Sequence, residues 1–214
     1  RSEIAADLVA KNCKAALTRI PLTRAEQKRL KIYEALLIRW QGMLNLVSTA
    51  SLPQLWTRHI IDSAQLRDIA PRAIRWADLG SGGGFPGMVI AILLAETPGA
   101  EVHLIERDKR KAAFLQTVSR ETGAAAIVHP ARIEAIVPGL QQIEIVTSRA
   151  LAPLTQLIDW SMPLFQRGAT GLFLKGRTVQ EEIATASDPK LDLSTLPSRT
   201  DSSGRIVSVR YKAK

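Results

Sequence analysis

Hydrophobic and polar positions change period along this chain, and the first clear period is that of an amphipathic helix. Between residues 24 and 44, apolar residues recur at steps of three and four, at Leu30, Tyr33, Leu37, Trp40 and Leu44. This spacing is typical of the buried face of a helix. Thr23 and Glu26 fit a capping box, so we expect the helix to begin immediately after Thr23.

Weaker helical patterns lie on either side of this helix. Residues 3–18 form one, and Ser51 can cap another that contains His59, Asp62 and Ser63. Those three side chains would share one helical face, which superficially suggests a catalytic trio. Because a charge relay is rarely built within one helical turn, we prefer a packed polar patch that docks the helix on the rest of the protein.

The remainder of the chain alternates between strand-like and helix-like segments. Apolar runs predict strands at 73–77, 101–106, 124–129, 143–148, 170–175 and 205–211, with helices at 88–94, 109–122, 153–165 and 181–186 and a polar turn at 197–204. Such alternation predicts an α/β fold with a doubly wound, mostly parallel sheet and an antiparallel last strand. We expect a helical extension over residues 1–72 and the sheet domain over residues 73–214, in one compact unit.

A glycine-rich loop joins the first predicted strand to the following helix. Five of the eight residues from Gly80 to Gly87 are glycine. Glycine lets a ligand approach the backbone closely, and a helix start offers unpaired N–H groups and the positive end of the helix dipole. At the carboxyl end of a first parallel strand, such a loop predicts a nucleotide-type cofactor site.

The identity of the cofactor depends on a neighbouring acid. Gly82, Gly84 and Gly87 satisfy the dinucleotide pattern G-x-G-x-x-G, but a loop this rich in glycine meets several patterns by chance. Asp78 would repel a pyrophosphate and would suit a cationic ammonium or sulfonium group, as in S-adenosyl-L-methionine. The alternative is a structural Asp78 that accepts hydrogen bonds from nearby loop N–H groups.

A second acid, Glu106, ends the second predicted strand, 26 residues after Gly80. An acid at this position of such folds accepts hydrogen bonds from the ribose hydroxyls of the cofactor. Four basic residues follow it, Arg107, Lys109, Arg110 and Lys111. A basic first helical turn is mildly unfavourable to the helix dipole, which favours a functional role over a merely solvated surface.

Positive charge is concentrated before the glycine loop. The formal net charge is +9 and the isoelectric point is about 10.1. Residues 1–75 hold 13 Lys and Arg against 6 Asp and Glu, a net of +7, whereas residues 76–214 hold 16 against 14, a net of +2. Although a solvated basic helix is the alternative, this excess favours a nucleic-acid partner. The candidate contacts are Lys28, Lys31, Arg39, Arg58, Lys109 and Arg110.

Several classes of protein are disfavoured. The single cysteine, Cys13, excludes an internal disulfide framework, and the three histidines are scattered, so we expect no metal site. The sequence contains no apolar run long enough to span a bilayer and no signal-peptide core, so we expect no membrane contact and a cytoplasmic location. We expect a monomer.

Seven short segments add a more specific pattern. They are Asn-Leu at 45–46, Arg-His-Ile-Ile-Asp-Ser at 58–63, the stretch 78–87, Leu-Ile-Glu at 104–106, Phe-Leu at 114–115, Ser-Arg-Ala at 148–150 and Leu-Lys-Gly at 174–176. Together they resemble the bacterial ribosomal RNA small subunit methyltransferase G family. The resemblance implies a class I, Rossmann-like methyltransferase that uses S-adenosylmethionine to methylate guanine N7 in a loop of 16S rRNA. The substrate would be this rRNA or a precursor of the small ribosomal subunit.

The resemblance also implies roles for individual residues. It places the cofactor against Gly80, Phe85, Ile133, Glu134 and Arg149, to which the pattern around the loop adds Asp78, Gly82 and Glu106. Ile133 departs from the family, in which a small residue is common at this position. The segment after residue 187 matches little and receives no role.

The implied chemistry needs no general base, because guanine N7 is an unprotonated acceptor that is nucleophilic at neutral pH. The residues at 147–149, Thr-Ser-Arg, replace the amide–proline motif of amino-group methyltransferases. We expect catalysis by positioning of N7 against the sulfonium methyl. The candidate catalytic residues are Arg149 and Lys175, at the ends of the fourth and fifth strands, which would hold the RNA or the purine O6.

Two other functions are compatible with the sequence alone. The first is an NAD-type Rossmann oxidoreductase, against which Asp78 and the absence of residues for hydride chemistry both count. The second is a non-enzymatic RNA-binding protein that uses the basic helices. Failure to bind S-adenosylmethionine would favour the second.

Overall fold

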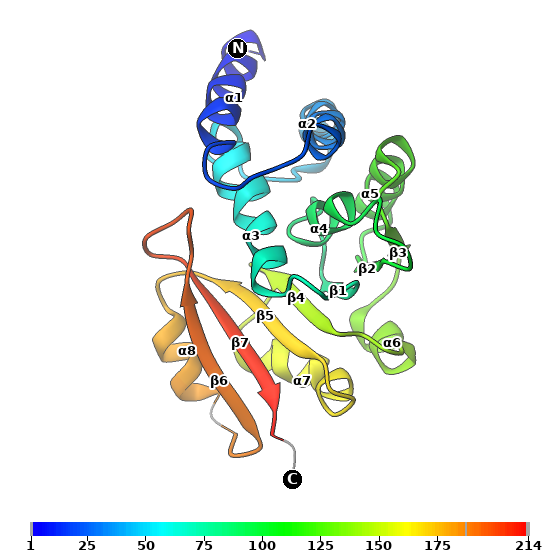
Figure 1. Cartoon of the computed structure of the whole chain (residues 1–214), viewed down its shortest axis with the longest axis vertical. Helices are drawn as coiled ribbons and strands as arrows, with labels where there is room; N and C mark the ends of the chain where they lie inside the picture. The colour runs from blue at the N-terminus through cyan, green and yellow to red at the C-terminus, as the bar shows by residue number, and fades with distance from the viewer. Residues whose placement is uncertain (1, 187, 213–214) are drawn as a thin grey trace.

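A helical region precedes the sheet in the computed structural model, which describes residues 2–186 and 188–212, with side chains from residue 8 onward. Its helices are α1 (Ser2–Ala16), α2 (Arg24–Leu44) and α3 (Asp62–Ile69). A 3₁₀ turn, η1 (Leu52–Gln54), and a π-helix, η2 (Trp56–Ile61), connect α2 to α3. Figure 1 shows α1 at one end of the long axis and the end of strand β7 at the other.

The described part of the chain contains one seven-stranded sheet. Its strands are β1 (Arg75–Leu79), β2 (Glu101–Ile105), β3 (Ala126–His129), β4 (Ile145–Arg149), β5 (Thr170–Lys175), β6 (Leu191–Pro197) and β7 (Arg205–Tyr211), in the order β3-β2-β1-β4-β5-β7-β6. The first five strands run parallel, and β7 is antiparallel to both β5 and β6. This confirms the predicted doubly wound, mostly parallel sheet. Strand order reverses between β1 and β4, which is where ligands bind in open α/β sheets.

Helices cover both faces of the sheet (Figure 1). One hydrophobic core contains α4 (Gly87–Leu93), α5 (Lys109–Thr122) and the N-terminal helices. The other contains α6 (Ile133–Ile136), the 3₁₀ turn η3 (Val137–Gly139), α7 (Leu154–Phe165) and α8 (Val179–Thr185). Successive strand residues point to opposite faces, so Trp76 enters the first core and Ala77 the second.

The predicted amphipathic helix is present as α2. The Thr23 hydroxyl accepts a hydrogen bond from the Glu26 N–H at 3.2 Å, and the Glu26 carboxylate accepts one from the Thr23 N–H at 2.7 Å. Leu30, Tyr33 and Leu37 are fully buried. Because this face packs on α4 and α5, the helical extension and the sheet share one hydrophobic core.

Some local features differ from the prediction. Strand β6 was not predicted because it is the edge strand and buries only Leu191, so its hydrophobic alternation is weak. β1 runs over residues 75–79 rather than 73–77. The helix predicted from Ser51 is divided into η1, η2 and α3, and the Ser51 side chain does not cap it, donating instead to the Ser48 carbonyl at 3.0 Å. The π-helix changes the relative directions of its side chains from those of α-helical spacing.

Candidate functional site

The glycine loop joins β1 to α4 and lies beside the switch point between β1 and β4. Gly80, Gly82 and Gly84 have φ angles of 66°, 53° and 99°. A Cβ atom on Gly80 would lie 2.5 Å from the Leu151 side chain, and one on Gly84 would lie 2.6 Å from the Tyr33 hydroxyl. Glycine is therefore required at both positions for backbone conformation and for space.

Asp78 is fully buried at the end of β1. Its Oδ2 accepts a hydrogen bond from the Gly87 N–H at 3.2 Å, and its Oδ1 accepts one from the Thr147 hydroxyl at 3.0 Å. Burial raises the pKa of this carboxyl to about 6. These contacts agree with the alternative given above, in which Asp78 has a structural role and accepts a hydrogen bond from an N–H group at the end of the loop. Its contact with the ammonium group of a cofactor stays a prediction.

The buried Asp78 carboxyl predicts a pH-dependent stability. Its pKa of about 6 lies above the ordinary value of 3.8, so its ionisation disfavours the folded state. This penalty is absent below the ordinary pKa, grows up to the folded-state pKa and is complete above it. The free energy of unfolding of Asp78→Asn minus that of wild type should therefore increase by on the order of 2–3 kcal/mol from about pH 4 to about pH 7.5. Urea denaturation of the free protein measures this, and the same free-energy difference at both pH values would contradict it.

A cavity of about 220 Å³, the small cavity, opens beyond the carboxyl ends of β1, β2 and β3. Four predicted cofactor residues line it together, Gly80, Glu106, Ile133 and Glu134. Glu106 is buried, and its Oε2 accepts a hydrogen bond from the Gly82 N–H at 2.8 Å. Glu134 is exposed, with its carboxylate 3.4 Å from the Arg132 guanidinium. The sheet therefore brings together residues from three separate strand–helix connections.

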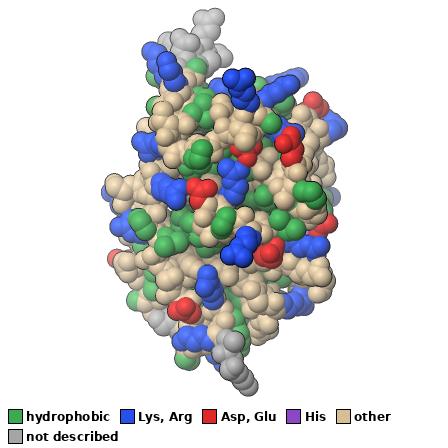
Figure 2. All heavy atoms as spheres, viewed as in Figure 1, with side chains coloured by type: hydrophobic (Ala, Val, Ile, Leu, Met, Phe, Trp, Pro, Cys, Tyr) green, Lys and Arg blue, Asp and Glu red, His purple; other side chains and the backbone are tan. Residues whose placement is uncertain are grey.

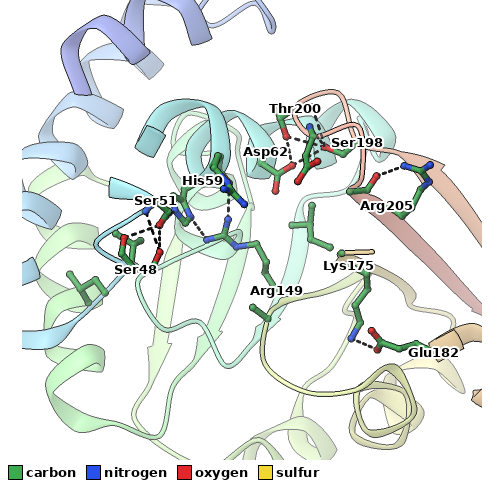
Figure 3. A pocket seen from close by; sticks show the side chains of 18 residues that line it. Ser48, Ser51, His59, Asp62, Arg149, Lys175, Glu182, Ser198, Thr200 and Arg205 are labelled. Carbon is green, nitrogen blue, oxygen red and sulfur yellow. Dashed lines mark hydrogen bonds and ion pairs between the residues drawn. The ribbon is translucent and has the colours of Figure 1, made fainter. Parts of the chain in front are cut away.

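A second cavity, the large cavity of about 550 Å³, adjoins the segment that follows β4 (Figure 3). Residues from distant parts of the chain line it, among them Arg58, His59, Asp62, Arg149, Lys175 and Arg205. Ala150 lines the large cavity and Leu151 lines the small one. The two cavities are thus separated by the segment that follows β4.

Arg149 reaches the large cavity from the end of β4 and is held by three contacts. Its Nη1 donates to the Arg58 carbonyl at 2.9 Å, its Nη2 lies 2.5 Å from Nδ1 of His59, and its guanidinium lies over the Phe85 ring, 5.0 Å from the ring centroid. Burial lowers the pKa of Arg149 below its ordinary value, yet arginine retains its proton in proteins. Phe85 is itself buried and packs against Tyr33. Arg149 is therefore a charged group with a fixed direction.

His59 is neutral in this arrangement. Burial, followed by the charges of Arg149 and Arg58, lowers the pKa of His59 to about 3. Its Nδ1 therefore accepts a hydrogen bond from Arg149, and its Nε2–H donates to the Ser51 hydroxyl at 2.9 Å. This tautomer follows from the two partners. The neutral imidazole of His59 therefore orients the Arg149 guanidinium. The sequence analysis did not predict this contact.

His59, Asp62 and Ser63 do not form a relay, in agreement with the preferred interpretation as a packed polar patch. Ser63 donates its hydroxyl proton to the His59 carbonyl at 2.6 Å, and Asp62 is hydrogen-bonded to Ser198 and Thr200 in the turn between β6 and β7. Neither side chain contacts the His59 ring nitrogens, whose partners are Arg149 and Ser51. α3 is thus docked through polar contacts, some of which are made with the turn between β6 and β7.

Lys175 lies at the end of β5 and is largely occupied. Its Nζ donates to the Ala152 carbonyl at 2.8 Å and lies 2.6 Å from the Glu182 carboxylate, with only 9 % of the side chain exposed. In this arrangement Lys175 holds the segment after β4 against α8. Its predicted contact with RNA or with the purine O6 would compete with these bonds and stays a prediction.

The basic residues predicted to contact nucleic acid are dispersed. Lys28, Lys31 and Arg39 are exposed on α2, Arg58 is exposed beside the large cavity, and Lys109 and Arg110 are exposed at the start of α5. Lys31 is paired with Glu34 at 2.9 Å and lies over the Trp56 ring. Figure 2 shows Lys and Arg side chains spread over the visible face with Asp and Glu among them, so this face has no single continuous basic patch.

Neither a membrane-spanning helix nor a cluster of metal-binding side chains occurs in the described part of the chain. None of its helices combines the length and apolar character needed to cross a membrane. Over the same residues, no three His, Cys, Asp or Glu side chains are grouped to hold a metal ion. Cys13 is buried and free.

Known proteins match this chain over most of its length. A family model described as rRNA small subunit methyltransferase G matches residues 26–203. The ribosomal RNA small subunit methyltransferase G of Parvibaculum lavamentivorans is 50% identical over 198 residues, which cover 92% of this chain and 87% of that protein. The protein with the same description from Bradyrhizobium sp. strain BTAi1 is 50% identical over 208 residues, which cover 96% and 94%.

Solved structures share the fold at low sequence identity. A methyltransferase from Geobacter sulfurreducens superposes with a TM-score of 0.59 at 10% identity, covering 90% of this chain and 91% of that one. A variant of MtNAS in complex with S-adenosylmethionine superposes with a TM-score of 0.54 at 15% identity, covering 88% and 76%. At this level of identity the likeness shows the fold.

Proposed function

Because the chain belongs to the ribosomal RNA small subunit methyltransferase G family, we propose that it transfers a methyl group from S-adenosylmethionine to N7 of a guanosine in 16S rRNA. The observation that carries the proposal is the pair of cavities at the switch point. One is lined by four of the eight predicted cofactor residues, whereas charged side chains, including the predicted cofactor residue Arg149, line the other, and the segment that follows β4 lies between the two cavities. This arrangement supports the proposal because a cofactor in one cavity and a base in the other would be neighbours across one short segment.

The small cavity suits the adenosyl part of the cofactor. Glu106 accepts hydrogen bonds from the Gly82 N–H and the Asp108 N–H, so its carboxylate is fixed at the position where ribose hydroxyls would donate to it. Ile133 supplies apolar contact for a base, and Gly80 leaves room that a side chain would fill. When bound, the cofactor supplies a sulfonium methyl group as the electrophile.

The large cavity suits the target nucleotide. Its volume of about 550 Å³ falls within the range of small-molecule sites, and Arg58, Arg149 and Arg205 give it positive charge for a nucleotide. Enzymes that modify a base take it out of the stack into such a pocket. Arg149, fixed by His59 and stacked on Phe85, would donate to the guanine O6 and so orient the adjacent N7.

Guanine N7 carries no proton, so the reaction needs no general base. We therefore predict 7-methylguanosine as the product and a single-turnover rate with no ionisation of an enzyme base between about pH 6 and 9. Transfer of a tritiated methyl group to 16S rRNA, followed by mass spectrometry of the nucleosides, identifies the product. Methylation of an exocyclic amine or a ribose would overturn the proposal. Calorimetry that detects NAD binding but no binding of S-adenosylmethionine would favour the oxidoreductase instead.

RNA affinity should fall steeply with salt, because basic side chains displace counterions from phosphates. Reversal of charge at Lys28, Lys31 and Arg39, all exposed on α2, should flatten the log–log slope by about 0.7 to 0.9 for each phosphate that is no longer neutralised. Charge reversal at Lys190 and Arg210 is the matched control and should leave the slope unchanged. These two residues lie at the end of the sheet formed by β7 and β6, whereas α2 packs on α4 and α5. A slope unaffected by the triple variant would show that the RNA lies elsewhere.

A further inference from the structure

Selection of guanine must come from the walls of the large cavity. One wall contains Asp62, at the start of α3, and the turn between β6 and β7, residues 198–204. In Figure 1 this turn reaches up beside α3, although it is far from α3 in sequence. Figure 3 shows Asp62, Ser198 and Thr200 together on this wall, with Arg149 on a different side of the cavity.

One oxygen of Asp62 is fully used by the protein. Its Oδ1 accepts hydrogen bonds from the Thr200 hydroxyl at 2.5 Å, the Gln65 amide at 2.8 Å and the Ser198 hydroxyl at 3.0 Å. Gln65 in turn accepts from the Arg199 N–H at 2.9 Å, so α3 and the turn fix the carboxylate from both sides. Among the described side chains, which begin at residue 8, and the described backbone, no hydrogen-bond donor contacts Oδ2, while the residue itself lines the large cavity.

The other acids that line this cavity are less suited to contact a base. Glu182 is engaged by the Lys175 ammonium at 2.6 Å and by the Leu154 N–H at 2.8 Å. Asp201 is exposed on the turn, and its Oδ1 accepts hydrogen bonds from the N–H and the hydroxyl of Ser203 in the same turn. Asp62 alone among the three combines a fixed position with a free oxygen that is partly shielded from water.

We propose that Asp62 selects guanine by accepting hydrogen bonds at Oδ2 from N1–H and the N2 amino group of the target base. The proposal rests on the function proposed above. Flipped bases are read at their Watson–Crick edge, where guanine presents the N2 and N1–H donors beside the O6 acceptor, and O6 and N7 together form the adjoining Hoogsteen edge. A guanine that donates N1–H and the N2 amino group to Asp62 leaves O6 and N7 free, so that O6 can accept from Arg149, which lines the same cavity. Adenine would place the N1 lone pair against the carboxylate and would be rejected.

Inosine tests the contact between Asp62 and the N2 amino group, because inosine differs from guanosine only in lacking that group. We would prepare 16S rRNA with guanosine or inosine at the position that the wild-type enzyme methylates, and measure single-turnover rates. In wild type, inosine should lower the rate roughly 10- to 100-fold. In Asp62→Ala, the guanosine rate should fall and the two substrates should differ by less than about 3-fold. Asp201→Ala, in the same cavity, is the matched control and should keep the wild-type ratio.

The ratio of the guanosine rate to the inosine rate distinguishes an effect on base recognition from an effect on folding. A loosened turn would lower the rate of methyl transfer to both substrates by the same factor. If Asp62→Ala is unfolded in a thermal melt, Asp62→Asn replaces it. The three donors to Oδ1 would hold the Asn oxygen there, which places the NH2 group at the Oδ2 position, where it cannot accept from the base, so this variant should also lose the ratio. A wild-type enzyme that is indifferent to inosine would overturn the proposal without any variant. So would loss of the ratio in Asp201→Ala and its retention in Asp62→Ala. Absence of 7-methylguanosine in guanosine-containing RNA would instead overturn the proposed function.

Discussion

Replacement of Gly80 by valine should weaken the binding of S-adenosylmethionine by roughly 100-fold or more, about 3 kcal/mol. Gly80 has a φ of 66°, which a β-branched residue rarely adopts, and a Cβ there would lie 2.5 Å from the Leu151 side chain. Both residues line the small cavity, so the added side chain and the displaced leucine would fill space that the cofactor needs. Titration calorimetry measures the loss of affinity.

Gly123 provides the matched control for backbone strain. It has a φ of 65° at the end of α5, and a Cβ there would have no atom within 4 Å. Gly123→Val should therefore lose folding stability through the same backbone strain and keep its affinity for the cofactor. An undiminished affinity in Gly80→Val, or an equal loss in both variants, would show that the small cavity is not the cofactor site.

Much of this fold could be predicted because its signals are local. The capping box at Thr23 and the apolar stripe of α2 lie within one helix, and each parallel strand is a short apolar run ended by a turn. Strand β6 lacked such a signal because an edge strand packs on one neighbour and leaves most of its residues exposed. The π-helix before α3 likewise has no sequence period of its own that would distinguish it from an α-helix.

The candidate cofactor site was partly predictable for a reason of topology. Gly80, Glu106 and Ile133 follow three different strands, and parallel strands present their carboxyl ends at one edge of the sheet. Residues that follow the carboxyl ends of neighbouring parallel strands can therefore be predicted to lie close together in space. Asp78 shows the limit of this reasoning, because the direction in which its buried carboxylate points depends on Thr147 and the backbone of α4.

Contacts between distant segments had no sequence signal. The pair Arg149 and His59 is separated by 90 residues, and Asp62 is separated by 138 from Thr200. Each depends on how the N-terminal helices and the C-terminal turn pack on the sheet, which hydrophobic periodicity does not determine. Lys175 illustrates the converse, because its partner Glu182 lies only seven residues away, yet nothing in the pattern favoured an ion pair over an RNA contact.

Loss of the Arg149 side chain should lower the single-turnover rate of methyl transfer by roughly 100-fold or more, because small errors in orientation at the reacting centre have effects of this size. Its guanidinium is fixed by the Arg58 carbonyl, by His59 and by the Phe85 ring, and this places a directed positive charge beside the segment that separates the two cavities. Arg149→Ala should remain folded, since its partners are a surface carbonyl, a neutral imidazole and an aromatic face. Rapid-quench measurement at saturating cofactor and RNA isolates the chemical step from binding.

Variants around Arg149 distinguish positioning from proton transfer. Arg149→Lys retains the charge but loses the planar fork, so it should restore only part of the rate. His59→Ala removes one of three contacts on Arg149 and should lower the rate less than Arg149→Ala, with a flat pH profile, because an imidazole with a pKa of about 3 has no proton to exchange at neutral pH. A different result would reassign the residues. If His59→Ala abolished methyl transfer at unchanged thermal stability, and the wild-type rate followed an ionisation near neutral pH, then His59 would be the catalyst and Arg149 the group that tunes it.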